Sequence, residues 1–592
     1  MADSISQLRQ LVHDCLAKHL YSAAIFWADK VVTLSNYAAT EVYTLAQAFF
    51  LNGQYRRCLT LLKNTGFVEK DLRFRYLAAK CLAECKEWEE CLEMLGGLNV
   101  EEPSELNFPM PRLAPGTINY LSVVCLLRGQ VYDALENYPR ATKWFRAALT
   151  LDPFNYEAFQ QLVESHKLTN EEELVLVASL PIPPTHEWLR LLYRSKCKKY
   201  EQGRSTEAIL DALENEPPNR QQQQQPAGAA GAAAAATSRL KPVQTPTKIG
   251  GDAQPQPMAG LSPVEEEPPS ASSAAAVVAA SPGWGLQDNL DVIACRADLL
   301  YHRGLYQECY DLTSAALERD PYAFECLPSH LASALELRKK NDLFVRAHKL
   351  AEGHPDKAVS WFAVGCYYMC TQQYEAARRH FGKATTLDRR FVPAWIGFGH
   401  AFAAQDESDQ AMAAYRTANR LFPGLHMPLM GMGMEYQRMN NLHLAEQMFL
   451  QAQKLCPSDP LVANELGVLA YRNRQYEAAA AWLQKALDVV PGALSATWEP
   501  TLTNLGHALR KLRRWAEALE CYHRALGFVP GQPGTYTAVG YTYHLMGDLD
   551  KAIDNYHKAL GLRPEDVFTT DMLALAVEED SERFRDMLRL GG

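Results

Sequence analysis

The sequence has 592 residues, of which 47% are hydrophobic and 22% charged, values typical of a soluble globular protein and not of a fibre or a wholly disordered chain. Acidic residues outnumber basic ones by 69 to 59, and the two signs are mixed along the chain, which gives no electrostatic footprint for a polyanion. Nucleic acid and anionic membrane surfaces are therefore not expected as partners.

The sequence carries no targeting or disulfide signature. Its first residues, MADSISQLRQ, lack the basic and then apolar order of a secretory signal, and no run of about 18 apolar residues follows. The 14 cysteines are scattered without paired spacing, so we expect buried free thiols. These features predict a soluble, intracellular protein.

Residues 1–200 carry a helical-hairpin pattern in a faint form. Small, aromatic and proline residues match one complete unit at Gly129, Tyr132, Ala141, Phe145, Ala148 and Pro153. Weaker units are marked by Tyr55 with Cys58 and by Trp88 with Cys91, and SAAIFWADKVV (22–32) has the signature of a second helix. We predict a divergent helical array here, with a Pro- and Glu-rich loop over residues 99–116.

Between residues 202 and 285 the composition changes to QQQQQ, GAAGAAAAA and dense prolines. Such a segment cannot bury enough apolar surface to offset the entropy lost on ordering. We therefore expect a disordered linker over 202–285, although alanine-rich runs can also form transient helix.

Three Ser/Thr-Pro dipeptides in this linker are candidate phosphorylation sites: Thr245 in TPTK, Ser262 in LSPVE and Ser281 in ASPGW. Thr245 has the Ser/Thr-Pro-x-Lys form that cyclin-dependent kinases favour. A phosphate would add about −1.5 to −2 charges and could pair with arginine. The alternative is that such dipeptides arise by chance in any Pro- and Ser-rich linker.

From about residue 289 onward a pattern repeats at 34 residues or twice that distance. A small residue recurs in the first helix of each unit, at Ala297, Gly365, Gly399, Gly433, Gly467, Gly506 and Gly540. A second small slot holds Ala377, Ala411, Ala445, Ala479, Ala518 and Ala552, and a proline closes most units, at Pro321, Pro355, Pro423, Pro457, Pro491, Pro530 and Pro564. Small residues let two helices approach closely, and proline ends the second helix because it lacks an amide proton.

This period is that of the tetratricopeptide repeat (TPR), a helical hairpin that buries its apolar face only by stacking on its neighbours. The sequence thus predicts an all-α, right-handed superhelical solenoid: a divergent array over 1–200, the linker, eight repeats over 289–566, and a capping helix and tail over 567–592. The register slips by five residues between Leu494 and Trp498. Arg389 stands where a proline is expected, and the unit 324–357 has leucines in all three small slots.

Motifs that would indicate an enzyme are missing from the sequence. GxxxxGK[ST], HExxH, CxxC and GxSxG do not occur. The 16 histidines are dispersed, and His400 and His507 share one repeat position without an acidic partner at metal-site spacing. We therefore expect no catalysis, no cofactor and no metal.

The concave surface of the second array is the candidate functional site. In a TPR unit the fifth, ninth and twelfth positions of the first helix tend to face it, and here they hold apolar, methionine and hydrogen-bonding groups that suit an extended or helical peptide. The alternative is that some of them only pack against neighbouring repeats. The candidate groove residues are Phe362, Cys366, Met369, His400, Met430, Met434, Gln437, Asn464, Tyr471, Thr503, His507, Arg510, Tyr541 and His544.

Several stretches depart from the general repeat pattern in a characteristic way. They include SAAIFWADKV, SWFAVGCYYM, AWIGFGHAFA, WEPTLTNLGHALRKL and YTAVGYTYHLMGDLDKAIDNYHKALGLRPED, and they span both arrays in order. Together they closely resemble the subunit-six family of the anaphase-promoting complex.

The resemblance implies a non-catalytic scaffold of a cell-cycle ubiquitin ligase, in the nucleus and cytoplasm. It implies homodimerisation through the N-terminal repeats, enclosure of the N-terminal segment of a small accessory subunit by the C-terminal superhelix, and stacking on related TPR subunits. The alternative is a stand-alone TPR peptide-binding adaptor or co-chaperone.

Overall fold

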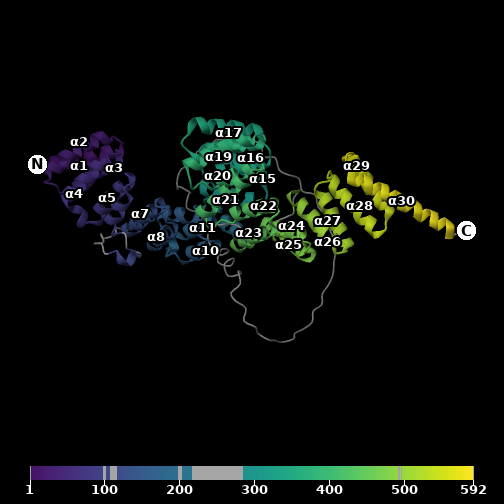
Figure 1. The fold of residues 1–592 in the computed structure, drawn as a ribbon. Coiled ribbons are helices and arrows are strands. Elements are labelled where there is room, and N and C mark those ends of the chain that lie inside the picture. Colours follow the sequence, from purple (N-terminus) through teal and green to yellow (C-terminus); the bar gives the residue numbers. More distant parts are fainter. Residues whose placement is uncertain are drawn as a thin grey trace, which may run out of the picture.

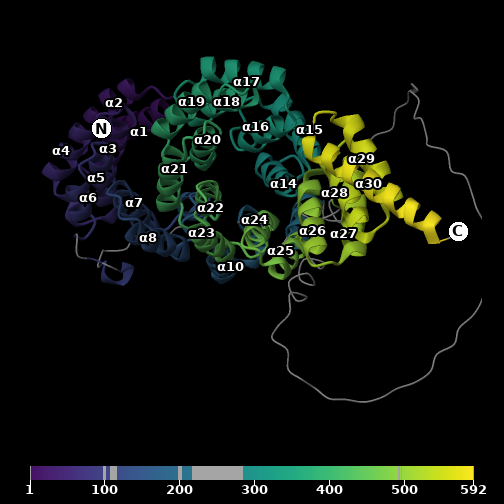
Figure 2. The ribbon, with the colours of Figure 1, turned by 45° about the vertical axis from the view of Figure 1, so that its right-hand side comes forward.

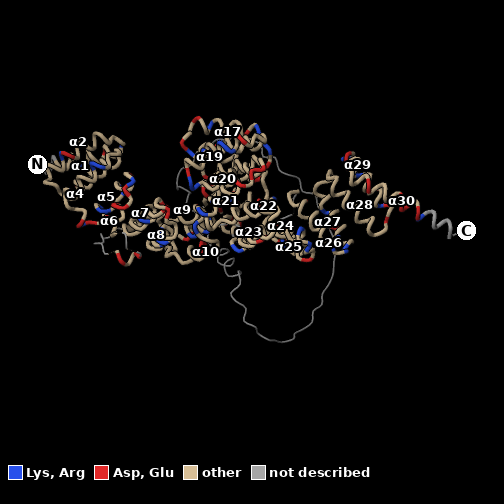
Figure 3. Tube along the Cα trace, in the orientation of Figure 1, with Lys and Arg blue, Asp and Glu red and all other residues tan. Residues whose placement is uncertain are grey.

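The computed structural model describes residues 2–97, 100, 102–106, 116–197, 203–215, 285–490, 494 and 496–590. Within these ranges the regular structure is entirely helical, and the all-α TPR solenoid expected from the sequence is confirmed (Figure 1). Helices pair into antiparallel hairpins, and successive hairpins stack. Figure 3 shows acidic and basic residues interspersed along the chain.

Among the described residues, the N-terminal part contains six successive pairs of helices. Their helices are α1 (Ala2–Ala17), α2 (Tyr21–Leu34), α3 (Ala39–Leu51), α4 (Tyr55–Thr65), α5 (Leu72–Glu84), α6 (Trp88–Met94), α7 (Tyr120–Ala134), α8 (Tyr138–Leu151), α9 (Tyr156–Val163), α10 (Asn170–Ser179), α11 (Glu187–Lys196) and α12 (Gly203–Glu214). Short 3₁₀ helices lie at η1 (Phe67–Glu69), η2 (Pro103–Glu105) and η3 (Pro184–His186).

The C-terminal part contains eight hairpins and a long last helix. These helices are α14 (Leu290–His302), α15 (Tyr306–Arg319), α16 (Leu327–Glu336), α17 (Lys340–Gly353), α18 (Ala358–Cys370), α19 (Tyr374–Leu387), α20 (Val392–Ala403), α21 (Ser408–Leu421), α22 (Met427–Arg438), α23 (Leu442–Leu455), α24 (Pro460–Arg472), α25 (Tyr476–Val489), α26 (Glu499–Lys511), α27 (Trp515–Phe528), α28 (Pro533–Met546), α29 (Leu549–Leu562) and α30 (Val567–Leu590). The 3₁₀ helix η5 (Ala496–Trp498) precedes α26, where the sequence register slips. In Figure 2 the first helices of the hairpins lie on the inner side of the arc and the second helices on the outer side.

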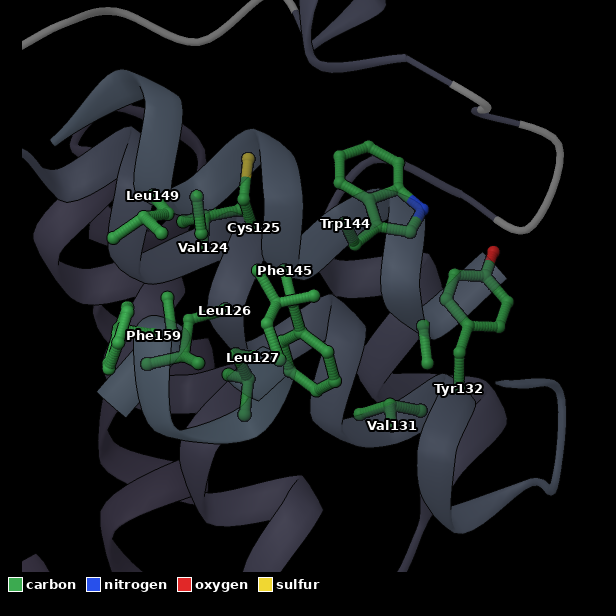
Figure 4. Close-up of a cluster of buried hydrophobic side chains, with 14 of the residues drawn as sticks. Val124, Cys125, Leu126, Leu127, Val131, Tyr132, Trp144, Phe145, Leu149 and Phe159 are labelled. Atoms are coloured by element: carbon green, nitrogen blue, oxygen red, sulfur yellow. The ribbon is translucent and has the colours of Figure 1, made fainter. Parts of the chain in front are cut away.

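Many of the hairpins are held by a large side chain of the second helix lying against a glycine of the first. A Cβ atom added to Gly129 would come within 3.0 Å of the Phe145 ring, and one added to Gly506 would lie 2.5 Å from Tyr522 Cε1. Figure 4 shows Phe145 in its cluster with Leu127 and Val131. Only glycine leaves room for such a close approach.

In the divergent hairpins a cysteine replaces the alanine of the second-helix slot. The thiols of Cys58, Cys91 and Cys309 are fully buried. Each donates a hydrogen bond of 3.2 Å to a carbonyl oxygen of the preceding helix, that of Ala46, Ala79 or Ala297 respectively. The cysteines therefore satisfy their polar hydrogen inside the helix pair, and they are free thiols as expected.

The unit over 324–357 keeps the hairpin form despite its leucines. Leu331, Leu343 and Leu350 are buried, and α16 is shortened to 10 residues. The ring of His330 is fully buried and makes two hydrogen bonds. Its Nδ1 lies 2.8 Å from Thr313 Oγ1, and its Nε2 lies 3.2 Å from Asp342 Oδ2. Larger side chains and a buried polar network thus replace the glycine contact in this unit.

The expected linker over 202–285 is wrong at its N-terminal end. Residues Gly203–Glu214 form α12, whose side chains Ile209, Leu210 and Leu213 are buried against α11 and α14. Arg296 of α14 reaches back to Glu214 at 2.7 Å. Helix α12 completes the last N-terminal hairpin and stacks directly on the first C-terminal one, so the two arrays adjoin in space.

Filling the close glycine contact should destabilise the solenoid. In Gly506→Ala the added methyl group meets Tyr522, and we expect a loss of about 1–3 kcal/mol, seen as a lower thermal unfolding temperature. Gly527→Ala is the matched control because nothing lies within 4 Å of the added methyl. In that helix position alanine should be neutral or stabilise by up to about 1 kcal/mol. Equal effects of the two substitutions would contradict the packing account.

Candidate peptide-binding groove

A hollow of about 550 Å³ opens on the inner face of the C-terminal array. It extends from α16 to α22, and much of its wall comes from the C-terminal ends of first helices and the turns that follow them. It contains three of the predicted groove residues. Its lining is Leu335, Arg338, Lys340, Met369, Cys370, Thr371, Gln372, Tyr374, His400, Ala403, Ala404, Tyr415, Gly431, Met434, Glu435 and Arg438.

Met369, His400 and Met434 are the predicted residues that meet in this hollow. Met434 is the most open of the methionines on the wall, with 43% of its surface exposed. His400 borders the hollow and lies edge-on to the Tyr415 ring, at 6.0 Å between ring centroids. His400 is exposed at the edge of the hollow, and desolvation by the neighbouring side chains lowers its pKa from the ordinary value.

Phe362 and Cys366 were expected in the groove, and the structure places both in the core instead. Phe362 is 6% exposed and packs against Phe381 and Phe391, while Cys366 is 1% exposed. Helix α18 is covered by α16, α17, α19 and α20, so these two positions face neighbouring helices and not the concave surface. Met430 is also half-buried against the core, and Gln437 is 8% exposed.

Farther along the array, the predicted polar residues make contacts between repeats. Asn464 Oδ1 accepts a hydrogen bond of 3.0 Å from Thr501 Oγ1 in the next first helix. Thr503 Oγ1 donates to Glu499 Oε1 at 2.9 Å, and the same carboxylate accepts from Thr535 of the following repeat at 3.0 Å. This ladder joins successive first helices. Asn464 therefore makes a contact between neighbouring repeats, which was the alternative to groove lining considered from the sequence.

Two further predicted histidines contact the tyrosines that fill the glycine slots. His507 Nδ1 lies 2.8 Å from Tyr522 Oη, and His544 Nδ1 lies 3.4 Å from Tyr556 Oη. His544 Nε2 also lies 3.0 Å from Glu579 of α30. The tyrosine hydroxyls are thus satisfied at the inner face, and the histidines hold the first helix to the second.

The remaining predicted residues are half-buried aromatic and cationic groups. Arg510 lies over the Tyr541 ring, 4.7 Å from its centroid, and Tyr541 also meets Phe568 of α30 edge-on. Tyr471 packs edge-on against Tyr476 in its own hairpin. These residues line the C-terminal hairpins, outside the hollow.

The position-based expectation missed the charged groups of the hollow. Glu435 is 2% exposed, its Oε2 has no hydrogen-bond partner, and its Oε1 lies 3.7 Å from Arg438. Arg338 from the turn between α16 and α17 and Lys340, the first residue of α17, also line the hollow. The sequence could have indicated two of these charged groups, because Glu435 and Arg438 lie within two residues of the predicted groove residue Gln437. The hollow therefore combines methionines, a buried carboxylate and several cations, which suits a polar peptide end with an apolar side chain.

Across the described ranges there is no cluster of His, Cys, Asp and Glu with the arrangement of a metal site. Nor does any described helix have the length and apolarity required to cross a membrane. The candidate phosphorylation sites Thr245, Ser262 and Ser281 lie outside the described residues.

The histidine–tyrosine contact predicts a pH dependence. Burial and the nearby Arg510 lower the pKa of His507 to about 4, against an ordinary value of about 6.5. Between these values the unfolded chain binds a proton and the folded chain does not, so this contribution to stability is complete above pH 6.5 and is lost as the pH falls toward 4. At pH 5 the loss is about 2 kcal/mol.

Thermal unfolding at pH 7.5 and pH 5.0 checks this expectation. His507→Gln should lose less stability than the unmodified chain between the two pH values. His348→Gln is the control, because the His348 side chain is 65% exposed and should not alter the difference. Parallel losses in all three proteins would show that His507 does not titrate with a depressed pKa.

Comparison with known proteins gives consistent matches along the chain. The family profile described as anaphase-promoting complex, cyclosome, subunit 3 matches residues 17–98, and tetratricopeptide repeat profiles match 123–155, 430–493 and 496–565. The chain is 43% identical to anaphase-promoting complex subunit 6 of Arabidopsis thaliana, with 98% of each chain covered. It is 36% identical to the cell division cycle protein 16 homolog of Homo sapiens, covering 98% of this chain and 86% of that protein.

A solved structure has the same architecture. The crystal structure of the APC/C hetero-tetramer Cut9-Hcn1 matches with a TM-score of 0.72 and 31% identity, covering 97% of this chain and 96% of the solved chain. The curated sequence of cut9, from Schizosaccharomyces pombe, is an anaphase-promoting complex subunit that is 32% identical over 98% of this chain. Identity at this level, along nearly the whole solenoid, means that the chain belongs to the anaphase-promoting complex subunit 6 family.

Proposed function

We propose that this chain is a non-catalytic scaffold subunit of the anaphase-promoting complex, a cell-cycle ubiquitin ligase. The observation that carries the proposal is the match to a subunit 6 relative over 98% of the chain and to the solved Cut9 chain over 97% of it. An array of stacked hairpins offers a long surface that holds several chains at fixed spacing. The alternative, a stand-alone adaptor or co-chaperone, is not favoured, because the similarity extends through both arrays and is not confined to one groove.

The inner face of the C-terminal array is proposed to enclose the N-terminal segment of a small accessory subunit. The hollow at Met369, His400 and Met434 supports this, because flexible methionines adapt to an inserted side chain. The buried carboxylate of Glu435 supplies an acceptor for a backbone N–H or an amine of that segment. The relative Cut9 is solved as a hetero-tetramer with Hcn1, which supports a second kind of subunit bound to this chain as well.

A charge placed in the hollow should release the accessory subunit. Met434→Glu puts a carboxylate beside Glu435 where an apolar group is needed, and we expect co-purification of the accessory subunit to fall at least tenfold. Met439→Glu is the matched control, because Met439 is 44% exposed against 43% for Met434 and lies outside the hollow lining. Retention of the subunit by Met434→Glu, at the level of the control, would remove the hollow from the binding surface.

The N-terminal hairpins are proposed to form a homodimer. Four large apolar side chains between α1 and α3 are more than half exposed: Leu20, Phe26, Leu34 and Tyr37. Phe26 stands out from α2 beside Trp27 and carries Lys30 over its ring. Exposed apolar groups gathered at one end of a solenoid are typical of a protein–protein interface. The hetero-tetrameric state of the relative Cut9 with Hcn1 supports two copies of this chain in one assembly.

Charging this surface should separate the two copies. For Phe26→Asp we expect light scattering after gel filtration to give the 66.3 kDa mass of one chain, where the unmodified chain gives twice that mass. Phe344→Asp is the control, because Phe344 on α17 is 53% exposed, close to the 55% of Phe26. A Phe26→Asp protein that keeps the double mass would show that this surface is not the dimer contact.

The remaining expectations from the resemblance are proposals of the same kind. We propose that the outer faces stack on related TPR subunits and that the chain acts in the nucleus and cytoplasm. Phosphorylation at Thr245, Ser262 or Ser281 is proposed as a means of adding negative charge to the assembly.

A further inference from the structure

Two parts of the chain that are about 250 residues apart meet between successive turns of the superhelix. Figures 1 and 2 both place α8 and α10 beside α21–α23. Arg389 Nη1 lies 3.1 Å from Glu136 Oε1, and Arg390 binds both Asp133 and Gln161, the latter at 2.5 Å. Hairpins in a solenoid ordinarily contact only their neighbours, whereas α20–α21 is six hairpins beyond α7–α8.

The ion pairs are centred on a carboxylate that is almost enclosed. We call the turn of the superhelix that contains α7–α10 the lower turn and the one that contains α20–α22 the upper turn (Figure 1). The Asp133 side chain is 6% exposed and contacts two cations, Arg390 of the upper turn and Lys167 of the lower turn. Lys167 Nζ lies 2.5 Å from Asp133 Oδ1. Such a carboxylate is costly to leave unpaired, and Arg390, whose side chain is 42% exposed, is open to screening by salt. Lys167 pairs with Oδ1 of this carboxylate inside the lower turn, and Arg390 adds a second cation at Oδ2 from the upper turn.

A backbone hydrogen bond and an apolar contact accompany the charges. The Gly424 N–H donates to the His166 carbonyl oxygen at 3.0 Å, which joins the loop after α21 to the loop after α9. Tyr138 of α8 packs against a buried cluster of the upper turn formed by Ala418, Leu421, Phe422 and Leu425. The contact therefore has ionic, backbone and apolar components.

The sequence departs from the repeat pattern at this contact. In the preceding unit the indole N–H of Trp361 donates to the carbonyl oxygen of Pro355 at 2.7 Å, and in this unit Trp395 donates to the carbonyl oxygen of Arg389 at 3.0 Å. The backbone carbonyl of Arg389 thus accepts the same tryptophan hydrogen bond that the proline carbonyl accepts in the preceding unit. Its side chain extends across the gap between turns, which proline could not do.

We propose that Arg389 and Arg390 form a lock with Asp133 and Glu136 that joins successive turns and sets the pitch of the superhelix. The same two helices that begin at the lock end at the hollow: α20 runs from Val392 to His400 and Ala403, and α22 from Met427 to Met434. The lock therefore also fixes how α20 and α22 are held where they line the hollow. The lock between the turns does not depend on which ligand the hollow binds.

The test is hydrogen exchange of the full-length chain, followed by mass spectrometry of the peptide over residues 422–426. This peptide contains the Gly424 amide, which is hydrogen-bonded to His166 across the turns. Pro423 has no backbone N–H and so does not contribute to the exchange signal. In the double variant R389E/R390E two carboxylates face Asp133 and Glu136, and we expect this peptide to exchange at least tenfold faster. Small-angle X-ray scattering should show a longer maximum dimension.

The matched control is R379E/K454E, which makes the same change in charge at two exposed positions of the second helices. It should leave both readouts unchanged. Unchanged exchange and unchanged dimensions in R389E/R390E would overturn the lock.

A salt series on the unmodified chain covers the case in which the double variant does not fold. At 1 M salt the screening length falls to about 3 Å, against about 10 Å at 0.1 M. We expect exchange of the 422–426 peptide to accelerate as salt rises, while peptides inside α21 stay protected. Exchange at 422–426 that is independent of salt would overturn the lock.

Discussion

The close approach of a glycine in one helix to a large side chain in the next is the contact on which the regular part of the solenoid depends. At Gly129, Gly365, Gly399, Gly433, Gly467, Gly506 and Gly540 a methyl group would come within 3.0 Å of a phenyl, phenol or leucine group. Burial of each such side chain stabilises a hairpin by about 2–3 kcal/mol, as an upper estimate. Because the hairpins that share this contact are nearly alike, their stacking produces a regular curvature and an inner face lined by first helices.

That contact also reaches the inner face directly. Where the slot is filled by tyrosine, the hydroxyl emerges beside a histidine of the first helix, as Tyr522 does beside His507. The core and the groove are therefore not independent layers. A change in the groove at His400 would act on the packing of Tyr415, and a change in packing would alter the wall of the hollow.

The repeat period was sufficient to predict the all-α solenoid, because packing of small against large residues leaves a trace in most of the C-terminal units. It was insufficient for the groove. Phe362 and Cys366 occupy groove positions of an average repeat, yet α18 is covered on several sides and both are buried. Helix α12 was overlooked beside the glutamine and alanine tract, although Ile209, Leu210 and Leu213 already have helical spacing. The contact of Arg390 with Asp133 could not be inferred, since 257 residues separate them and no local pattern records superhelical pitch.

The central claim is that this solenoid holds other chains of a ubiquitin ligase together. Affinity purification of a tagged chain expressed at its native level, with mass spectrometry of the bound proteins, tests it most directly. The account predicts recovery, in comparable amounts, of a small accessory subunit, related TPR subunits, and cullin-like and RING-type subunits. Recovery of chaperones alone would contradict it and would favour a free peptide-binding adaptor.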